Sequence, residues 1–261
     1  RLRQVVTAVA DGAIAATSIE KYVHDLRDEL GLKKEEKEEE KTTSVATEQE
    51  HFLDDELRQQ LVAVIDRFEN PVEIVVFKDP SNEESVNIEN AVKDITSISP
   101  EKLKFSSYNE GENKDLEAKV KITRTPTIAV LDKDGNYSGL KYSSLPSGHE
   151  LNSFILGLYN VAGPGQKVAA ESLEKIEKIN KPVNIKIGIS LSCTKCPKTV
   201  QATQRIATLN KNVEMEMINI FTFQDFKNRY DIMSVPAIIV DDQHIYFGEK
   251  TVEDMLEIIN K

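Results

Sequence analysis

The sequence contains two cysteines, and both lie in the tetrapeptide Cys193-Thr194-Lys195-Cys196. Such a pair could form a reversible disulfide, contribute to a zinc site, or close a small structural loop. A structural zinc site needs four ligands, but there is no second pair and the four histidines lack zinc-binding spacing. A disulfide over two intervening residues restricts the unfolded chain only slightly, so it would add little stability as a purely structural bridge. Reversible dithiol chemistry in a reducing compartment such as the cytoplasm is therefore the preferred interpretation.

Cys193 has the features of an attacking sulfur. An apolar run ending at Ile189 predicts a strand, and a helix is predicted to start at the cysteines, with Pro197 in its first turn. The unpaired amides and dipole of a helix N-terminus lower a thiol pKa from about 8.5, and Lys195 adds positive charge. We therefore expect Cys193 to be the nucleophile and Cys196 to be the resolving thiol that releases a mixed-disulfide partner.

A second motif, Val235-Pro236, precedes a strand-like run 40 residues after the CxxC. Alone, a proline opening a strand can simply end an edge strand. Together with the CxxC, the arrangement resembles the thioredoxin superfamily, in which a cis-proline loop faces the dithiol and offers backbone groups to an extended substrate. The resemblance implies that Ser192, Lys195, Val235 and Pro236 contact the substrate.

Strand-like and helical runs recur twice in the same order. The first set predicts strands at 72–77, 103–106, 127–132 and 136–144, with helices at 83–97 and 148–160. The second set predicts strands at 183–189, 213–218, 237–241 and 244–248, with helices near 165–180, 222–230 and 251–260 and another from Cys196 to about Leu209. The two sets lie about 110 residues apart, which is longer than the repeat of a solenoid protein, so two fused copies of one small domain are favoured.

The register of the repeat follows from two landmarks. Pro71 recurs as Pro182 at an offset of 111 residues, and Pro126 recurs as Pro236 at an offset of 110 residues. The offset of 111 places Asn82 and Ser85 at the positions of the two cysteines. The predicted fold class is therefore α/β with two fused thioredoxin-like folds, each a central mixed sheet flanked by helices. Only the second fold carries a CxxC.

Composition divides the chain ahead of the repeats. Residues 1–30 show an Ala-rich amphipathic pattern that predicts a helix, and residues 31–47 form a Lys/Glu-rich linker without an apolar face. The capping box Thr47–Glu50 then predicts the start of a new domain. We expect the first thioredoxin-like fold at residues 48–162 and the second at residues 163–261.

Longer motifs narrow the resemblance. The segments SLPSGHELNSFILGLYNVAGPGQ, ISLSCTKCPKTVQATQRIATLN and FQDFKNRYDIMSVPAIIVDD resemble the tandem, glutaredoxin-like domain of the alkyl hydroperoxide reductase flavoprotein subunit and its protein disulfide oxidoreductase relatives. The resemblance covers roughly residues 50–261. It implies a module that takes electrons from the dithiol of a flavoprotein reductase core and passes them to the disulfide of a peroxiredoxin.

Glu150, the glutamate of a Gly-His-Glu motif, is the third candidate site residue. From the residues alone, a helix-capping or decorative role is the preferred interpretation. The resemblance instead implies that Glu150 lies close to the dithiol, across a two-fold interface, and assists proton transfer.

Residues 1–30 resemble the C-terminal helix of a low-molecular-weight thioredoxin reductase. The simplest interpretation is a flavin-dependent reductase with the tandem domain as a C-terminal extension, of which this chain is the end. The chain has no G-x-G-x-x-G motif, so no cofactor site is assigned to it. FAD and NAD(P)H are expected in the missing part of the full-length protein, and the Cys193–Cys196 disulfide is the redox group of this chain.

Composition limits the partners. A net charge of −11 disfavours nucleic acid, and no apolar run reaches the ~18 residues of a membrane span. Three other functions remain open: a general protein disulfide reductase or isomerase, a glutathione-linked glutaredoxin, and a non-catalytic docking scaffold with an incidental CxxC. A homodimer is also left open.

Overall fold

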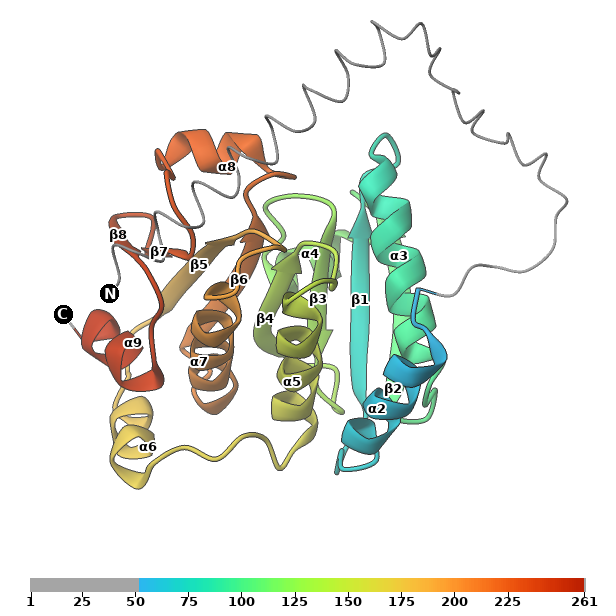
Figure 1. Cartoon of the computed structure of the whole chain (residues 1–261), viewed down its shortest axis with the longest axis horizontal. Helices are drawn as coiled ribbons and strands as arrows, with labels where there is room; N and C mark the ends of the chain where they lie inside the picture. Colours follow the sequence, from blue (N-terminus) through green and yellow to red (C-terminus); the bar gives the residue numbers. More distant parts are fainter. Residues whose placement is uncertain (1–51, 261) are drawn as a thin grey trace, which may run out of the picture. The chain divides into compact units, whose positions relative to one another are not determined.

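A computed structural model describes residues 52–260 as an α/β protein built on a single eight-stranded mixed sheet (Figure 1). The strands are β1 (Val72–Lys78), β2 (Leu103–Asn109), β3 (Thr127–Leu131), β4 (Tyr137–Ser143), β5 (Val183–Ile189), β6 (Val213–Asn219), β7 (Ala237–Val240) and β8 (His244–Phe247). The helices are α2 (Asp55–Ile65), α3 (Glu83–Thr96), α4 (Lys114–Val120), α5 (Glu150–Ala162), α6 (Ala170–Glu177), α7 (Cys196–Leu209), α8 (Gln224–Arg229) and α9 (Val252–Ile259).

The sheet repeats one strand pattern twice. Its order is β2-β1-β3-β4-β6-β5-β7-β8. In each half the first two strands pair parallel and the other pairings are antiparallel. This pattern agrees with the predicted pair of thioredoxin-like folds, of which only the second has a CxxC.

The halves meet where β4 pairs parallel with β6, from Leu140 opposite Met215 to Ser143 opposite Ile218. Equivalent strands therefore run in the same direction and in the same order across the sheet. The two folds therefore follow one another head to tail in the sheet.

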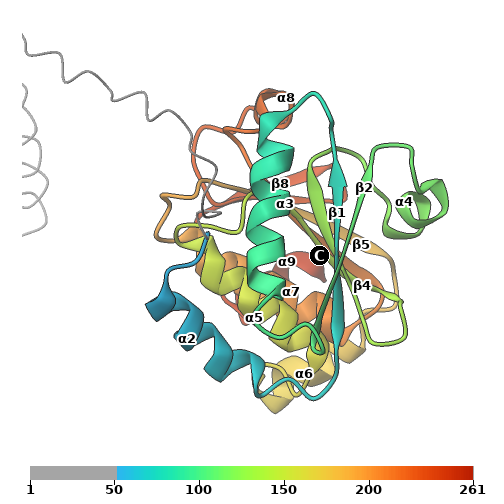
Figure 2. The ribbon, with the colours of Figure 1, turned by 90° about the vertical axis from the view of Figure 1, so that its right-hand side faces the viewer.

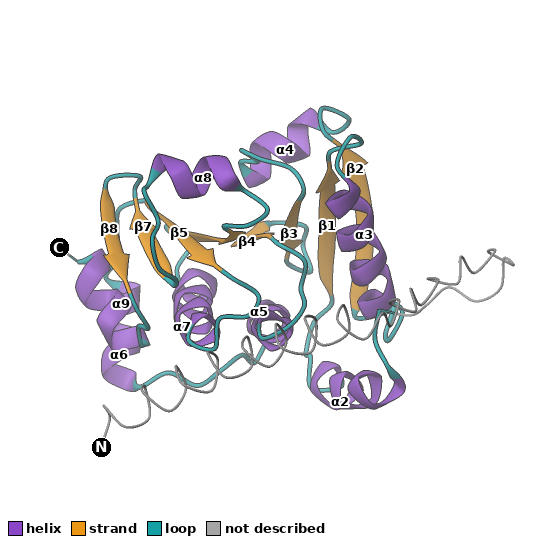
Figure 3. Cartoon of the chain, turned by 45° about the horizontal axis from the view of Figure 1, so that its top comes forward, coloured by secondary structure: helices purple, strands orange, loops and turns teal. Residues whose placement is uncertain are grey.

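The two faces of the sheet are covered differently. Figure 3 shows α4 and α8 on one face and α5 and α7 on the other, and Figure 2 shows α3 on the side opposite α4. The face under α3, α5, α7 and α9 carries one apolar core that runs through both halves. The opposite face carries two separate apolar clusters, one beside α4 and one beside α8.

Between those two clusters lies a buried ion pair that joins the folds. Arg124 Nη1 lies 3.0 Å from Glu216 Oε1, and the side chains are only 15% and 3% exposed. The Ser143 hydroxyl donates to the same Glu216 oxygen at 2.7 Å. The Arg124 guanidinium also packs over the Phe223 and Phe226 rings, 5.5 and 5.2 Å from their centroids. Arg124, from the loop before β3, therefore supports α8 of the second fold.

Two features differ from the sequence prediction. Helix α4 was not predicted, because it is short, mostly charged, and buries only Val120. The helix predicted near 165–180 is shorter, Ala170–Glu177. The predicted capping box Thr47–Glu50 lies outside the described residues. Within them, α2 begins at Asp55, and the Asp54 side chain accepts a hydrogen bond from the Leu57 N–H at 2.8 Å.

Residues 1–51 and 261 are not described, so the predicted helix at 1–30 and the linker at 31–47 lie outside the structure. Among residues 52–260, no helix has the length and apolar character needed to span a bilayer.

Candidate active site

The two cysteines form a disulfide at the carboxyl end of β5, where the chain enters α7. The Cys193 N–H donates to the Ser190 carbonyl at 2.9 Å, which holds the connecting loop in a tight turn. Cys196 is fully buried, whereas Cys193 is partly exposed. A partner disulfide can therefore reach Cys193 first. This difference in access supports Cys193 as the nucleophile and Cys196 as the resolving thiol. Both roles stay predictions.

The N-terminus of α7 stabilises negative charge at Cys193. The Cys196 N–H donates to Cys193 Sγ at 3.1 Å, and the N-cap residue Lys195 provides no side-chain cap. The first amide of the helix is therefore bonded to sulfur, and the N-cap side chain does not compete for it. A thiolate at this place is favoured by the amide hydrogen bond and by the helix dipole.

The loop before β7 faces the disulfide, as the sequence predicted. The Val235–Pro236 bond is cis, and the Val235 carbonyl oxygen lies 3.8 Å from Cys193 Sγ. Pro236 is buried, and the sheet ladder begins only at Ala237. The Val235 backbone is thus held beside the sulfur but outside the sheet.

A pocket of about 530 Å³ opens beside Cys193. Of the predicted substrate-contacting residues, Ser192, Lys195 and Val235 line it, while Pro236 lies buried next to it. Sequence reasoning missed the far wall of the pocket, which is formed by Ile220, Phe221, Lys227, Ile232 and Met233. The signal in the sequence was limited to one large apolar residue in each of two predicted loops, Phe221 before the helix at 222–230 and Met233 after it.

Glu150 is the first residue of α5 and is fully buried. Among the described residues, neither of its carboxylate oxygens has a hydrogen-bond partner. Burial raises the pKa of Glu150 to about 7. Glu150 therefore sits in the protein as a carboxyl group that can hold or release a proton near neutral pH.

The beginning of α5 packs against the loop that leads to the dithiol. The His149 N–H donates to the Leu191 carbonyl at 3.4 Å. A Cβ atom at Gly148, which has a φ of +57°, would lie only 2.8 Å from that same carbonyl oxygen. This close approach brings the Gly-His-Glu motif of the first fold to the redox loop of the second.

A buried polar chain links the same helices and was not foreseen from the sequence. The Tyr142 hydroxyl donates to Gln204 Oε1 at 3.0 Å, and Gln204 Nε2 donates to the Ser153 carbonyl at 2.9 Å. Burial and the nearby Glu150 carboxyl raise the pKa of Tyr142. The three residues come from β4, α7 and α5, so no local pattern could have connected them.

The corresponding place in the first fold is closed without sulfur. Asn82 Oδ1 caps α3 by accepting from the Glu84 N–H at 2.9 Å, and Ser85 Oγ accepts from the Asp79 N–H at 3.0 Å. Ser85 is buried, as Cys196 is. The Thr125–Pro126 bond is also cis. The first fold therefore keeps the geometry of the site while oxygen atoms replace its sulfurs. Among residues 52–260, no group of three potential metal ligands is present.

Comparisons with known proteins agree with this geometry. The Thioredoxin_3 family model, a thioredoxin domain, matches residues 183–260. The AhpF component of alkyl hydroperoxide reductase from Staphylococcus aureus strain NCTC 8325 is 29% identical over 204 residues, which are 78% of this chain and 37% of that protein. The chain thus spans well under half of the length of this curated relative.

Two solved structures share the fold. The NTD_N/C domain of alkyl hydroperoxide reductase AhpF from Enterococcus faecalis (V583) is 35% identical with a TM-score of 0.76, and the match covers 80% of this chain and all of that one. A protein disulfide oxidoreductase from Aeropyrum pernix superposes with a TM-score of 0.72 over 80% of this chain and 94% of that one, at 23% identity. The chain therefore belongs to the AhpF family of alkyl hydroperoxide reductase components, as a tandem thioredoxin-fold, thiol–disulfide oxidoreductase domain.

Proposed function

We propose that this chain carries electrons from the dithiol of a flavoprotein reductase core to the disulfide of a peroxiredoxin. One observation supports this most directly: an accessible Cys193 sulfur at a helix N-terminus, facing the Val235 backbone, with its partner Cys196 buried behind it. The similarity to AhpF proteins supports a reductase core as the donor and a peroxiredoxin as the acceptor. The cytoplasm is the compartment that this proposal implies.

The exchange proceeds in two displacements. The Cys193 thiolate attacks one sulfur of the acceptor disulfide, so an S–S bond forms to Cys193 and the second acceptor sulfur leaves as a thiolate. Cys196 then loses its proton and attacks Cys193, which closes the internal disulfide and releases the other acceptor sulfur. Two electrons pass to the acceptor, whose two thiolates take up protons. The dithiol of the reductase core reduces Cys193–Cys196 again by the same two steps in reverse.

Glu150 is proposed as the proton carrier for Cys196. A buried thiol needs a base before it can attack, and burial raises the pKa of Glu150 to about 7, which suits both release and uptake of a proton near neutral pH. The contact between His149 and Leu191 brings the start of α5 to the redox loop. FAD and NAD(P)H would be bound by the reductase core, and no residue of this chain is assigned to either.

The test uses the pre-reduced chain and follows oxidation of its dithiol after rapid mixing with an oxidised 2-Cys peroxiredoxin or with insulin. The proposal expects the peroxiredoxin to react at least about 100-fold faster. Equal rates would instead support a general protein disulfide reductase. In parallel, Cys196→Ser should accumulate a mixed disulfide between Cys193 and the peroxiredoxin, which mass spectrometry identifies.

Glu150→Gln tests the proton carrier separately. The variant should slow peroxiredoxin reduction by about 10-fold or more, within the range for general acid–base catalysis. It should also shift the pH dependence of Cys196 alkylation. An unchanged rate and pH profile would leave Glu150 without a catalytic role.

A further inference from the structure

The cis-proline loop is expected to receive an extended segment of the acceptor. We infer that the pocket beside Cys193 additionally selects segments with an acidic side chain and a large apolar side chain next to their cysteine. The inference rests on the proposed function, which makes this pocket the docking site of a disulfide-bearing partner. It adds the chemistry of the segment that the pocket prefers.

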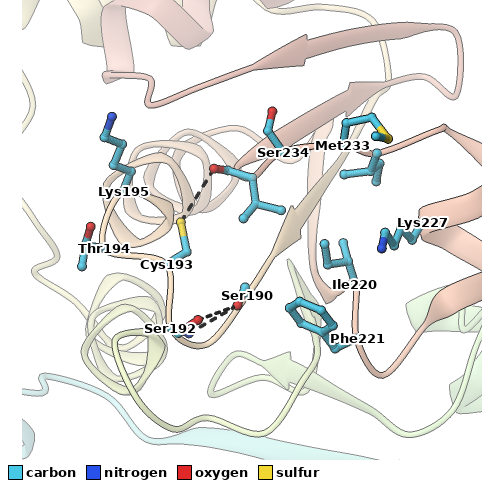
Figure 4. Close-up of a pocket in the computed structure, with 12 residues that line it drawn as sticks. Ser190, Ser192, Cys193, Thr194, Lys195, Ile220, Phe221, Lys227, Met233 and Ser234 are labelled. Carbon is cyan, nitrogen blue, oxygen red and sulfur yellow. Dashed lines mark hydrogen bonds between the residues drawn. The ribbon is translucent and has the colours of Figure 1, made fainter. Parts of the chain in front are cut away.

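The apolar requirement comes from Phe221 and Met233. At 61% and 85% exposed, these are the two most exposed large apolar side chains within residues 52–260. Figure 4 shows them on the side of the pocket away from Lys195, with Ile220 close to Phe221. Exposed apolar groups gathered at one pocket indicate a surface that is covered by a partner. An apolar side chain flanking the acceptor cysteine would cover them.

The acidic requirement comes from the charges at the pocket. The chain has a net charge of −11, yet the residues that line this pocket include Lys195 and Lys227 and no carboxylate. Within the described residues, neither lysine forms an ion pair, and Lys227 Nζ instead lies 6.0 Å from the Phe221 ring centroid. Lys227 therefore provides a positive charge, held next to the apolar wall, that an acidic side chain of the partner can neutralise.

The extended shape comes from the backbone of Val235. Its N–H has no hydrogen-bond partner among the described residues, and the ladder of β7 starts two residues later. A partner segment can pair with this N–H only if its own backbone is extended. The pairing would place the partner cysteine beside Cys193, whose sulfur lies 3.8 Å from the Val235 carbonyl oxygen.

The first fold shows that the thioredoxin fold does not require these pocket residues. At an offset of 110 residues, Gly111, Glu117 and Thr123 stand where the second fold has Phe221, Lys227 and Met233. Glu117 accepts a hydrogen bond from the Gly111 N–H at 2.7 Å, so an acidic side chain occupies the equivalent of the lysine position. The apolar pair and the lysine therefore occur only in the fold that carries the dithiol.

The experiment compares two mixed disulfides of small peptides with thionitrobenzoate. The peptides have the same sequence around Leu-Cys but differ in one flanking residue, Glu or Lys. Reduction by the pre-reduced chain is followed by release of the chromophore. We expect the second-order rate constant of this single-turnover reaction to favour the Glu peptide by about 3- to 10-fold at low salt and less at high salt. Lys227→Glu should invert the preference.

Lys211→Glu is the matched control, because it makes the same change in net charge in the loop before β6, at the opposite end of the parallel strands from the dithiol. It should keep the preference of the wild type. Equal rates for both peptides, or the same inversion in Lys211→Glu, would overturn the inference. Phe221→Ser should lower the second-order rate constant for the Leu peptide about fivefold more than for a Ser-Cys analogue, and an equal effect on both would refute the apolar requirement.

These outcomes are independent of the proposed acceptor. A peroxiredoxin that is reduced rapidly by a chain without peptide preference would refute only the inference about the pocket. A clear peptide preference without reduction of the peroxiredoxin would refute only the identity of the acceptor.

Discussion

The loop after β1 and the loop after β5 hold the same place in two copies of one fold, but different atoms close them. In the first copy, oxygen atoms of Asn82 and Ser85 accept the backbone hydrogen bonds at the start of α3 and the end of β1. In the second, a helix amide donates to the sulfur of Cys193. An oxygen cap satisfies amides and leaves nothing reactive, whereas a sulfur in the same field becomes a better nucleophile.

The two cis-proline loops differ in the same way. The Thr125 hydroxyl donates to Glu110 at 2.9 Å and so closes its side of the first fold. Val235 has no polar side chain that could form such a bond. Within the described residues the N–H groups of Thr125 and Val235 both lack a hydrogen-bond partner, so the two loops differ in their side chains. The comparison shows that the fold alone does not make a redox site. Reactivity also requires sulfur at the start of the helix, which only the second fold has.

Removing the dithiol from the second fold, or moving it to the first, should have the largest effect on the rate of peroxiredoxin reduction. Cys193→Ser should lower peroxiredoxin reduction by a factor of about 10³ or more, because the attacking sulfur is lost. Adding Asn82→Cys and Ser85→Cys to a variant without the native cysteines should restore less than about 1% of the rate, because Glu110 and Thr125 close that site. Recovery above a tenth of the wild-type rate would show that the helix N-terminus alone is sufficient.

The next effect concerns the ion pair that joins the folds. Arg124→Met should lower the free energy of unfolding by about 3 kcal/mol, because it leaves the buried Glu216 carboxylate without its partner. Adding Glu216→Gln should recover much of this loss. Lys198→Met, in the exposed pair with Glu249, should cost less than about 1 kcal/mol. Urea denaturation measures the free energy of unfolding of all three variants. Equal losses of stability in Arg124→Met and Lys198→Met would contradict a special role for the buried ion pair between the folds.

Glu150, at the contact between the two folds, should make the free energy of unfolding depend on pH. Its pKa is about 7 in the folded protein against an ordinary 4.5, so the unfolded chain ionises first as pH rises. The free energy of unfolding should therefore fall between about pH 4.5 and 7. Glu150→Gln cannot ionise, so it should match the wild type near pH 4 and exceed it by about 3 kcal/mol at pH 8. Parallel stability curves across this range would show that the carboxyl is hydrated.

The smallest change in stability is expected at Asn82, the N-cap of α3 in the fold without cysteines. Asn82→Ala should destabilise the protein by about 1 kcal/mol, because the Glu84 N–H loses its acceptor. Asn82→Ser, which keeps a capping oxygen, should change the stability little. Thermal unfolding of the two variants measures the difference. If both variants lose the same stability, the side chain of Asn82 does not act as a cap.

The sequence predicted the second fold better than the first. The strand at 183–189 and the helix from Cys196 to Leu209 agree with β5 and α7 residue for residue, because an apolar run and Pro197 mark their limits. Helix α4 was missed, since a short charged helix has little periodicity. Glu150 was noticed only through family resemblance, because its burial depends on packing between helices.

Apart from the cis-proline loop beside the dithiol, which the family resemblance implied, contacts between distant segments could not be predicted. Phe221, Lys227 and Met233 meet at one pocket only after the loops beyond β6 and α8 come together. Arg124 and Glu216 are 92 positions apart in the sequence, and each looks like an ordinary surface charge in its own segment. Such pairs follow from the head-to-tail joining of the folds, which no local pattern encodes.

The pairing of β4 with β6 also limits how this molecule can be divided. A fragment containing only the second fold would expose the backbone donors and acceptors of β6 that β4 now satisfies. It would also leave the Glu216 carboxylate in an apolar setting without Arg124 and Ser143. An uncovered edge strand is a template for pairing with other chains, so the fragment should aggregate. The first fold, although it carries no cysteine, is therefore expected to keep the redox fold from associating with other chains through this edge.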